Sequence, residues 1–442
     1  MKTLPVQAVN QSSQTTKSAV YYFCAVLIGV LTGIVGGVFH QSLQGVTSLT
    51  AHLPFLLGLE GPLLYLFMGL FSALMFCGAV ALVRSFAPEA SGSGVQEVEG
   101  AMAGLRQVRW QRILPVKFMG GILALGAGLV GGREGPTIHM GAAIAQAISA
   151  RFAFGVQEAR ALLGAGGAAG LTAAFNAPLA SMIFILEEAR NVFPNTARTY
   201  TGVIIACGCS AVITMLMSGT TPFMALTATQ MPLEFLPVFV LLGVILGVAG
   251  VVFNKTILFG LDKAQDIGLR VSPYFLPALL GLVIGPLVIA FPAATGGGES
   301  LVMTIVNHPL PVGLLGLVVL IRFFATAASY SSGAPSGVFA PILALATSLS
   351  VFLLGLLELV MTVPPGAIVA FAVAGMAGLF ASTIRAPLVG MVLVVELTGT
   401  YALIMPVLLT AVTANLIAES LGGKPLYEVL LARTLRLAKS ST

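Results

Sequence analysis

The 442-residue chain carries only 37 charged side chains, 21 basic and 16 acidic, which is 8% of its residues. A soluble globular protein has about 25% charged residues, so these side chains are too few to cover a surface of this size. Hydrophobic residues make up 57% of the chain. The composition excludes a soluble enzyme, a nucleic-acid-binding protein, a disordered scaffold and a disulfide-stapled secreted module, and it predicts a protein of the lipid bilayer.

Two kinds of apolar segment follow one another along the chain. Segments long enough to cross about 30 Å of hydrocarbon are predicted at 21–39, 62–84, 113–131, 199–218, 235–253, 275–291 and 311–330. Shorter segments, or segments interrupted by Gly and Pro, lie at 134–150, 157–175, 177–187, 337–357, 366–382, 386–396 and 402–418. Helices that stop inside a membrane are tolerated only where protein or a watery cavity surrounds their ends. This pattern is typical of transporters and channels.

The two halves of the chain carry the same landmarks in the same order. The paired segments are 88–94 with 292–298, 116–118 with 321–323, 132–136 with 337–341, and 177–187 with 386–396. We interpret residues of about 20–220 and 232–420 as two structural repeats. The spacing leaves open whether the repeats are parallel or inverted. In both cases a binding site is expected at the repeat interface, near the middle of the membrane.

Three glycine-containing loops stand at the mouths of apolar segments. Glycine lets the backbone approach a ligand closely, and proline suits the first turn of a following helix. The first-turn amides have no partner within the helix, and the helix dipole makes that end partly positive. Several such ends predict an anion site that holds its ion weakly enough to release it; the alternative is that the loops only terminate helices. The loop residues are Gly92, Ser93, Gly94, Val95 and Gln96; Gly132, Arg133, Glu134, Gly135 and Pro136; and Gly337, Val338, Phe339, Ala340 and Pro341.

A few acidic residues are predicted at membrane depth, where such groups are costly and usually functional. Glu134 heads an apolar helix, so its carboxylate is expected to occupy the positive helix end that an anion would use, and protonation would free it. The alternative is that Glu134 pairs with Arg133 or caps the helix. Glu187 and Glu188 end another apolar run. Because Glu396 is the repeat mate of Glu187, a structural role is favoured for that pair, which leaves Glu188 to collect protons from the cytoplasm.

No arrangement typical of an enzyme is visible in the sequence. The four histidines are scattered without metal-ligand spacing, and the four cysteines lie in apolar runs as structural thiols do. An intramembrane enzyme and a non-transporting scaffold are therefore disfavoured, and neither a metal nor a cofactor is expected. These residues are His40, His52, His139 and His308, and Cys24, Cys77, Cys207 and Cys209.

Taken together, the loops resemble the signature of the CLC chloride channel and transporter family. Tyr427 follows the last span, where it is either a hydroxyl donor or an interfacial anchor, and it matches a tyrosine of that signature. The similarity runs from about residue 20 to 435 and is greatest to the bacterial proton-coupled branch. It includes the stretches PEASGSG, LPVKF, AAFNAPLA, SSGAPSGVFAP, RAPL and GGKPLY.

The resemblance implies an all-α polytopic membrane protein with two inverted-topology repeats of tilted and partly broken helices. The CLC transmembrane domain would span 20–435, between a cytoplasmic segment 1–19 and a short cytoplasmic tail 436–442 with no regulatory domains. It also implies a homodimer in the inner membrane, with both termini cytoplasmic and a separate pathway in each subunit.

Six residues receive roles from the resemblance. A central chloride would be bound by the hydroxyls of Ser93 and Tyr427 and by the amides of Val338 and Phe339. Glu134 would be the external gate that exchanges protons, and Glu188 would be the internal proton-transfer residue. Gln96 stands where the family loop has proline, so this loop gains an N–H group and loses a fixed φ angle.

The predicted function is therefore a proton-coupled antiporter that exchanges Cl⁻ for H⁺, with membrane lipid around it and no nucleic-acid partner. The alternatives are a passive chloride channel and a CLC transporter with an altered preference, such as fluoride or nitrate. The presence of both Glu134 and Glu188 disfavours the channel, and Ser93 favours chloride.

Overall fold

The computed structural model describes residues 6–152, 154–190, 192–194 and 196–440. In these residues the chain is helical, and its β structure is a single isolated antiparallel bridge between Gly132 and Gly337. Eight helices of the described chain are long and apolar enough to cross a membrane. The protein is therefore a multi-pass membrane protein.

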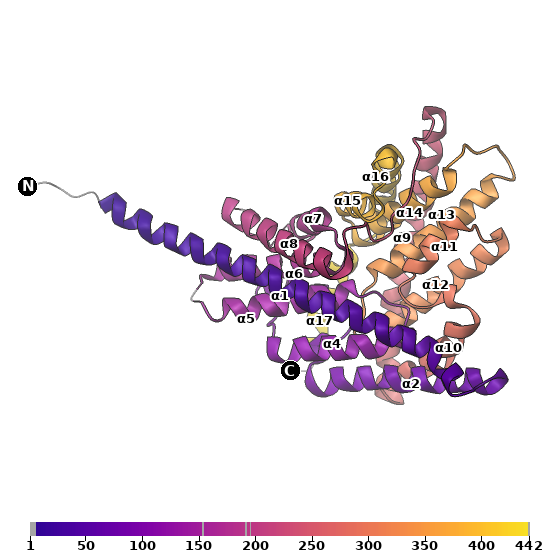
Figure 1. The fold of residues 1–442 in the computed structure, drawn as a ribbon, viewed down its shortest axis with the longest axis horizontal. Helices are drawn as coiled ribbons and strands as arrows, with labels where there is room; N and C mark the ends of the chain where they lie inside the picture. Colours follow the sequence, from indigo (N-terminus) through magenta and orange to yellow (C-terminus); the bar gives the residue numbers. More distant parts are fainter. Residues whose placement is uncertain (1–5, 153, 191, 195, 441–442) are drawn as a thin grey trace, which may run out of the picture.

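The helices follow one another with short connections, and the N-terminal turns of the first helix project beyond the others (Figure 1). The helix bounds are α1 (Val6–Leu56), α2 (Gly61–Phe86), α3 (Val95–Met102), α4 (Trp110–Gly126), α5 (Glu134–Ser149), α6 (Val156–Phe175), α7 (Pro178–Glu188), α8 (Ala197–Ser218), α9 (Leu236–Arg270), α10 (Phe275–Ala290), α11 (Glu299–Asn307), α12 (Val312–Ser331), α13 (Phe339–Leu357), α14 (Ala367–Ile384), α15 (Pro387–Thr398), α16 (Ile404–Ser420) and α17 (Leu426–Ser440). Short 3-10 helices lie at η1 (Pro88–Ala90), η2 (Leu233–Phe235), η3 (Pro292–Ala294) and η4 (Tyr401–Leu403).

Several boundaries differ from those expected from hydropathy. The apolar segment 113–131 is helical only to Gly126, because the chain then turns through Gly128 at φ 94° into the loop that leads to Glu134. The predicted terminal segments are partly helical: residues 6–19 open α1, and residues 436–440 close α17. Residues 1–5 and 441–442 of those segments lie outside the described residues.

Glycines allow the closest helix crossings. A Cβ atom on Gly141 of α5 would overlap the carbonyl oxygen of Gly166 of α6, and one on Gly166 would overlap that of Gly141. Between α2 and α10, a Cβ on Gly285 would overlap the carbonyl of Met68. Small residues are needed here because van der Waals contact, rather than the hydrophobic effect, holds helices together in lipid.

Repeat-related segments share the same backbone conformation. The residues before α3 and α11, Gly94 and Gly298, have φ angles of 87° and 89°. The residues after α6 and α14, Asn176 and Arg385, are both left-handed, with φ angles of 52° and 67°. The landmarks that match in sequence therefore match in local structure too.

The helices α7 and α15 show that the repeats are inverted. Glu396, near the end of α15, accepts hydrogen bonds from the amides of Leu179 and Ala180 at the start of α7, at 3.1 and 2.9 Å. Glu187, near the end of α7, accepts the amides of Leu388 and Val389 at the start of α15, at 3.3 and 2.8 Å. Each helix end caps the other helix, so the two run antiparallel, and the structural role predicted for these two glutamates is confirmed.

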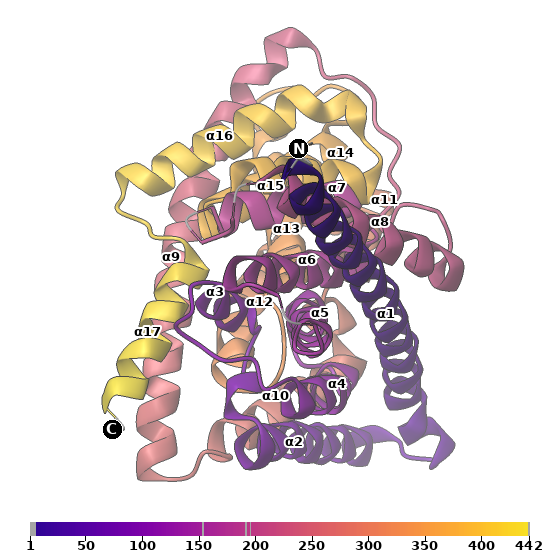
Figure 2. The ribbon, with the colours of Figure 1, turned by 90° about the vertical axis from the view of Figure 1, so that its left-hand side faces the viewer.

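The C-terminal helix α17 lies along α9 (Figure 2). Arg433 holds it there by hydrogen bonds to Asp262, Gln265 and the carbonyl of Leu261, at 2.9, 2.7 and 3.1 Å. The start of α17 is thereby placed against the middle of the molecule, where Tyr427 is fully buried.

We predict that Gly141→Ala lowers the free energy of unfolding by about 1–3 kcal/mol, because the added methyl group forces α5 and α6 apart. The measurement is thermal unfolding of the detergent-solubilised protein. The matched control is Gly208→Ala in α8, where an added Cβ meets no atom within 4 Å. Equal melting temperatures for the two variants would contradict the close crossing.

Candidate functional site

The three predicted loops meet at one place. Gly132 and Gly337 exchange backbone hydrogen bonds of 2.9 and 2.6 Å, and the amide of Ser336 donates to the carbonyl of Gly92 at 3.1 Å. A Cβ on Gly135 would lie 2.8 Å from the Cα of Ser93 and 2.9 Å from the Cα of Gly337. The loops thus leave no space for a side chain at their junction, and they bring together the first turns of α3, α5 and α13.

The carboxylate of Glu134 lies at this junction. Its side chain is fully buried, and its Oε1 accepts the amide hydrogen of Phe339, the first residue of α13, at 2.6 Å. Its Oε2 has no hydrogen-bond partner among the described residues. The carboxylate therefore occupies the positive end of a helix from the other repeat, where an anion would be stabilised.

Glycine makes room for this carboxylate on two sides. A Cβ atom on Gly132 or on Gly337 would overlap the carboxylate oxygens of Glu134. Arg133 does not pair with Glu134: its guanidinium contacts the ring of His40, lies 4.4 Å from the ring centre of Phe223 and donates from Nε to the carbonyl of Ala174 at 3.1 Å. The alternative of an Arg133–Glu134 ion pair is therefore wrong.

Ser93 and Tyr427 lie on the other side of the junction. Both side chains are fully buried, and the Ser93 hydroxyl accepts the amide of Val95 at 3.1 Å. The ring of Tyr427 lies 5.9 Å from that of Phe339. Its hydroxyl is buried and has no hydrogen-bond partner among the described residues. An anion here would meet two hydroxyls beside the helix end of Phe339, and Val338 is buried next to them.

Two buried cations hold the repeat-related loops. Lys117 donates to the carbonyls of Gly92 and Ser93 at 2.6 and 3.0 Å. Arg322, its counterpart in the second repeat, donates to the carbonyls of Ala293 and Thr295 at 2.9 and 2.8 Å. Both side chains are fully buried. Because carbonyls turn toward these cations, loop amides and hydroxyls remain available for an anion.

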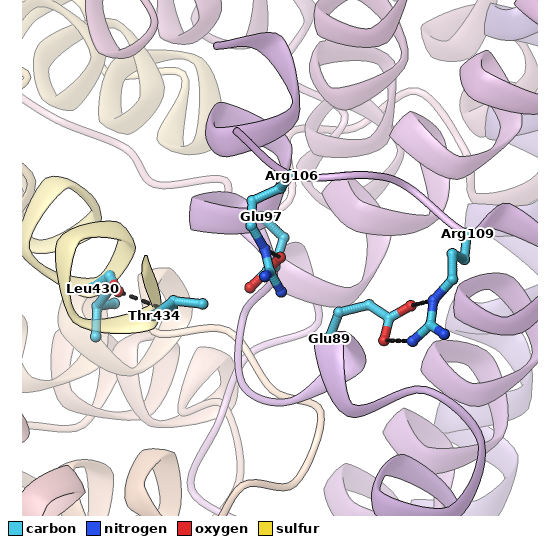
Figure 3. A network of polar contacts seen from close by, with 6 residues as sticks. All are labelled: Glu89, Glu97, Arg106, Arg109, Leu430 and Thr434. Carbon is cyan, nitrogen blue, oxygen red and sulfur yellow. Dashed lines mark hydrogen bonds and ion pairs between the residues drawn. The ribbon is translucent and has the colours of Figure 1, made fainter. Parts of the chain in front are cut away.

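A cavity of about 320 Å³, which we call the α17 vestibule, opens beside the first loop and reaches Gly92, Gln96 and Tyr330. Ion pairs line it: Arg106 donates to Glu97 at 2.7 Å, and Arg109 binds Glu89 through two nitrogens at 2.7 and 2.5 Å (Figure 3). Burial raises the pKa of Glu89, but the hydrogen bonds and charge of Arg109 lower it more, so its pKa lies below the ordinary value. The vestibule is therefore polar, with its cations already paired.

A second cavity of about 590 Å³, the α1 vestibule, lies on the other side of the loops. It is lined by residues of α1 between 40 and 51 and by the segments 125–133 and 288–300. Gly132 and Arg133 belong to its wall, so only the second loop separates it from Glu134. The predicted site thus lies between two water-accessible spaces, as a transport pathway requires.

Glu188 faces a third cavity of about 180 Å³, together with Glu99 and Glu428. The carboxyl groups of Glu188 and Glu99 lie within hydrogen-bonding reach of each other. Two carboxyls share a hydrogen bond only when one of them carries a proton, because two carboxylates repel.

Sequence reasoning found the loop residues, but it missed three residues around them. It assigned no role to Glu99 beside Glu188, to Tyr330 in the α17 vestibule or to Lys117 behind the first loop. The segment 116–118 that contains Lys117 recurs as 321–323, with Arg322 in its place. That recurrence of a cation at matched positions was the available signal. His139, which sequence reasoning placed near the loops, is fully buried and packs its ring against Gly94.

Comparison with known proteins agrees with this geometry. A family profile described as "Voltage gated chloride channel" matches residues 73–419. This chain belongs to the voltage-gated chloride channel (CLC) family. The fold class expected from sequence, an all-α CLC fold of two inverted repeats, is confirmed.

Bacterial CLC proteins are among the relatives that are similar to this chain. The H(+)/Cl(-) exchange transporter ClcA of Vibrio cholerae is 41% identical over 99% of this chain and 94% of its own length. ClcA of Salmonella typhimurium is 41% identical over 93% of this chain and 88% of its own. The crystal structure of a slow cyanobacterial Cl-/H+ antiporter, 36% identical, superposes with a TM-score of 0.90 over 94% of this chain and 98% of the antiporter. A eukaryotic CLC transporter at 22% identity, with a TM-score of 0.79 over 94% of this chain and 74% of its own, shares the fold.

We predict that Lys117→Met and Arg322→Met each destabilise the protein by about 2 kcal/mol, because both leave buried carbonyls without a charged donor. Only Lys117→Met should also weaken chloride binding, by about tenfold or ~1.4 kcal/mol, since its loop carries Ser93. Calorimetric titration with chloride and thermal unfolding test the two effects. Equal chloride affinity in the two variants would contradict a binding role for the loop that Lys117 holds.

Proposed function

We propose that this CLC protein is an antiporter that exchanges chloride for protons across a bacterial inner membrane. The relatives named above as H(+)/Cl(-) exchange transporters support this activity. The observation that carries it is the position of Glu134, whose buried carboxylate accepts the Phe339 amide at the head of α13. The Glu134 side chain competes with the anion for the N-terminal end of α13, and it also binds and releases a proton. This one residue therefore couples the movement of the two ions.

The mechanism follows from that competition. While Glu134 is ionised, its carboxylate occupies the helix end and closes the path between the two vestibules. Once it is protonated, it is neutral and gains less from the helix dipole. Chloride then takes its place, held by the amides of Val338 and Phe339 and by the hydroxyls of Ser93 and Tyr427. Glu134 then loses its proton, and the return of the ionised carboxylate to the helix end displaces the anion.

Glu188 is proposed to supply protons from the other side. It lines a cavity together with Glu99 and Glu428, on the side of the molecule where α17 lies. We assign this side to the cytoplasm. In this proposal both chain termini are cytoplasmic and the α1 vestibule faces outward. The reaction uses only the transported ions and needs no cofactor or enzyme chemistry. Boundaries of about 20–220 and 232–420 for the repeats, within a domain of 20–435, fit this scheme.

A homodimer is part of the same proposal. The helices α7, α8, α15 and α16 carry exposed apolar side chains, among them Leu179, Ile204, Leu388 and Leu408. A second copy on this face would cover the pair of mutually capped helices and leave each subunit its own pathway.

We predict that Glu134→Gln reduces proton flux by about 100-fold or more while chloride flux continues, because the amide cannot release a proton. Paired chloride and pH electrodes on proteoliposomes under a chloride gradient provide the measurement. Glu358→Gln, at the exposed end of α13, is the control and should behave as the parent protein. Intact coupling in Glu134→Gln would refute the gate, and a lack of proton flux in the parent protein would make it a passive channel.

We predict that Glu188→Gln also abolishes proton transport but leaves the gate and the chloride path in place. The matched control is the neighbouring Glu187→Gln, whose carboxylate caps α15. That control should lower the melting temperature and keep the coupling. If Glu188→Gln transports protons at the parental rate, Glu188 is only a surface acid.

A further inference from the structure

The α1 vestibule contains an acid that the proposed mechanism does not use. Among the described residues that line this cavity, Glu299 is the one acidic side chain. It is the first residue of α11 and follows Gly298, which has a φ angle of 89°. Its side chain is partly exposed to the cavity. The loop that carries it is the repeat mate of the loop that carries Ser93.

Glu299 lies near Gly131 and Gly132, which separate the α1 vestibule from the Glu134 carboxylate. The amide of Gly296 donates to the carbonyl of Gly128 at 3.2 Å, which joins the two loops of the cavity. A Cβ placed on Gly297 would lie 3.6 Å from the carbonyl oxygen of Gly131 and 3.8 Å from the Glu299 carboxyl carbon. Gly132, the next residue, lines both the cavity and the space of the Glu134 carboxylate.

The other charged groups near Glu299 come from α1 and α12. From α1, His40 contacts Arg133, which also stacks on Phe223. From α12, the guanidinium of Arg322 lies beside Gly298 and donates from Nε and Nη2 to the carbonyls of Ala293 and Thr295, while its Nη1 has no hydrogen-bond partner among the described residues. Glu299 forms no ion pair within the described part of the chain. Its carboxylate therefore faces the cavity without a bound cation from the described chain.

We propose that Glu299 is the vestibule carboxylate that passes protons between Glu134 and the solution on the α1 side. The inference rests on the proposed function, in which Glu134 must exchange its proton with that side. A cavity of about 590 Å³ has room for several waters. The O–H bond of the Glu134 acid breaks as its proton passes to a water. That water gives a proton to the Glu299 carboxylate, which releases it to bulk water, and uptake follows the reverse path.

A purely electrostatic role is the competing explanation. A negative charge in the vestibule repels chloride and would slow its access without carrying any proton. The two roles differ in what they require of Glu134. A relay matters only while Glu134 exchanges protons, whereas repulsion acts on chloride whether or not Glu134 is present.

The test uses the full-length protein in proteoliposomes. Glu299→Gln should lower the rate of coupled exchange by about tenfold and keep the ratio of chloride to protons unchanged, since Glu134 still alternates normally. The loss should be greatest at high pH on the α1 side, where few hydronium ions replace the relay. Glu299→Asp keeps a carboxyl and should restore most of the rate. Ser300→Ala, a change to a neighbouring lining residue without a titrating group, is the control.

The same substitution is then made in a Glu134→Ala background, which the proposed mechanism expects to carry chloride without proton exchange. There Glu299→Gln should leave chloride flux unchanged. If it changes chloride flux equally in both backgrounds, or leaves the coupled rate and its pH profile unaltered, the relay is wrong. If Glu134→Ala itself stays fully coupled, it is the proposed function that fails, so the two failures are distinguishable.

Discussion

Two hydrogen bonds between Gly132 and Gly337 join the loops of the two repeats at the place where the first turns of α3, α5 and α13 meet and would otherwise leave backbone groups unpaired. No lipid can satisfy such groups, so the loops must satisfy each other. Because both residues are glycines, the loops approach closely and still leave space for one carboxylate. The helix ends of α5 and α13 are thereby fixed on either side of Glu134, and the site exists only while both repeats are in place.

The distribution of charge around this junction follows the same constraint. The buried cations Lys117 and Arg322 are solvated by carbonyl dipoles and are not paired with carboxylates. Their positive potential therefore reaches the junction without presenting an ammonium or guanidinium to the ion. A directly coordinated cation would hold an anion too tightly for rapid release. Amides, hydroxyls and distant positive charges together make a site that binds an anion and can still release it.

The sequence predicted the features that depend on local chemistry. Glycines, prolines and their recurrence revealed the loops, the repeats and the structural role of Glu187 and Glu396, because backbone geometry restricts which residues fit there. It could not predict partners set by tertiary packing. Nothing local indicates that Arg133 turns to His40, or that Glu99 lies beside Glu188, since these contacts join segments 93 and 89 residues apart. The end of α4 at Gly126 could not be predicted from hydropathy either, because the apolar run continues beyond that residue.

The mutual capping of α7 and α15 has a consequence for biosynthesis. The amide of Ala180 receives its partner, Glu396, only after 216 more residues have been added. At about 5–20 residues per second, that delay is on the order of 10–40 s. During this time the first repeat lies in the membrane with the start of α7 unpaired and with half of its ion path missing. Until its second half arrives, the amides at the start of α7 are free to pair with other membrane proteins, so the first repeat cannot complete its own fold.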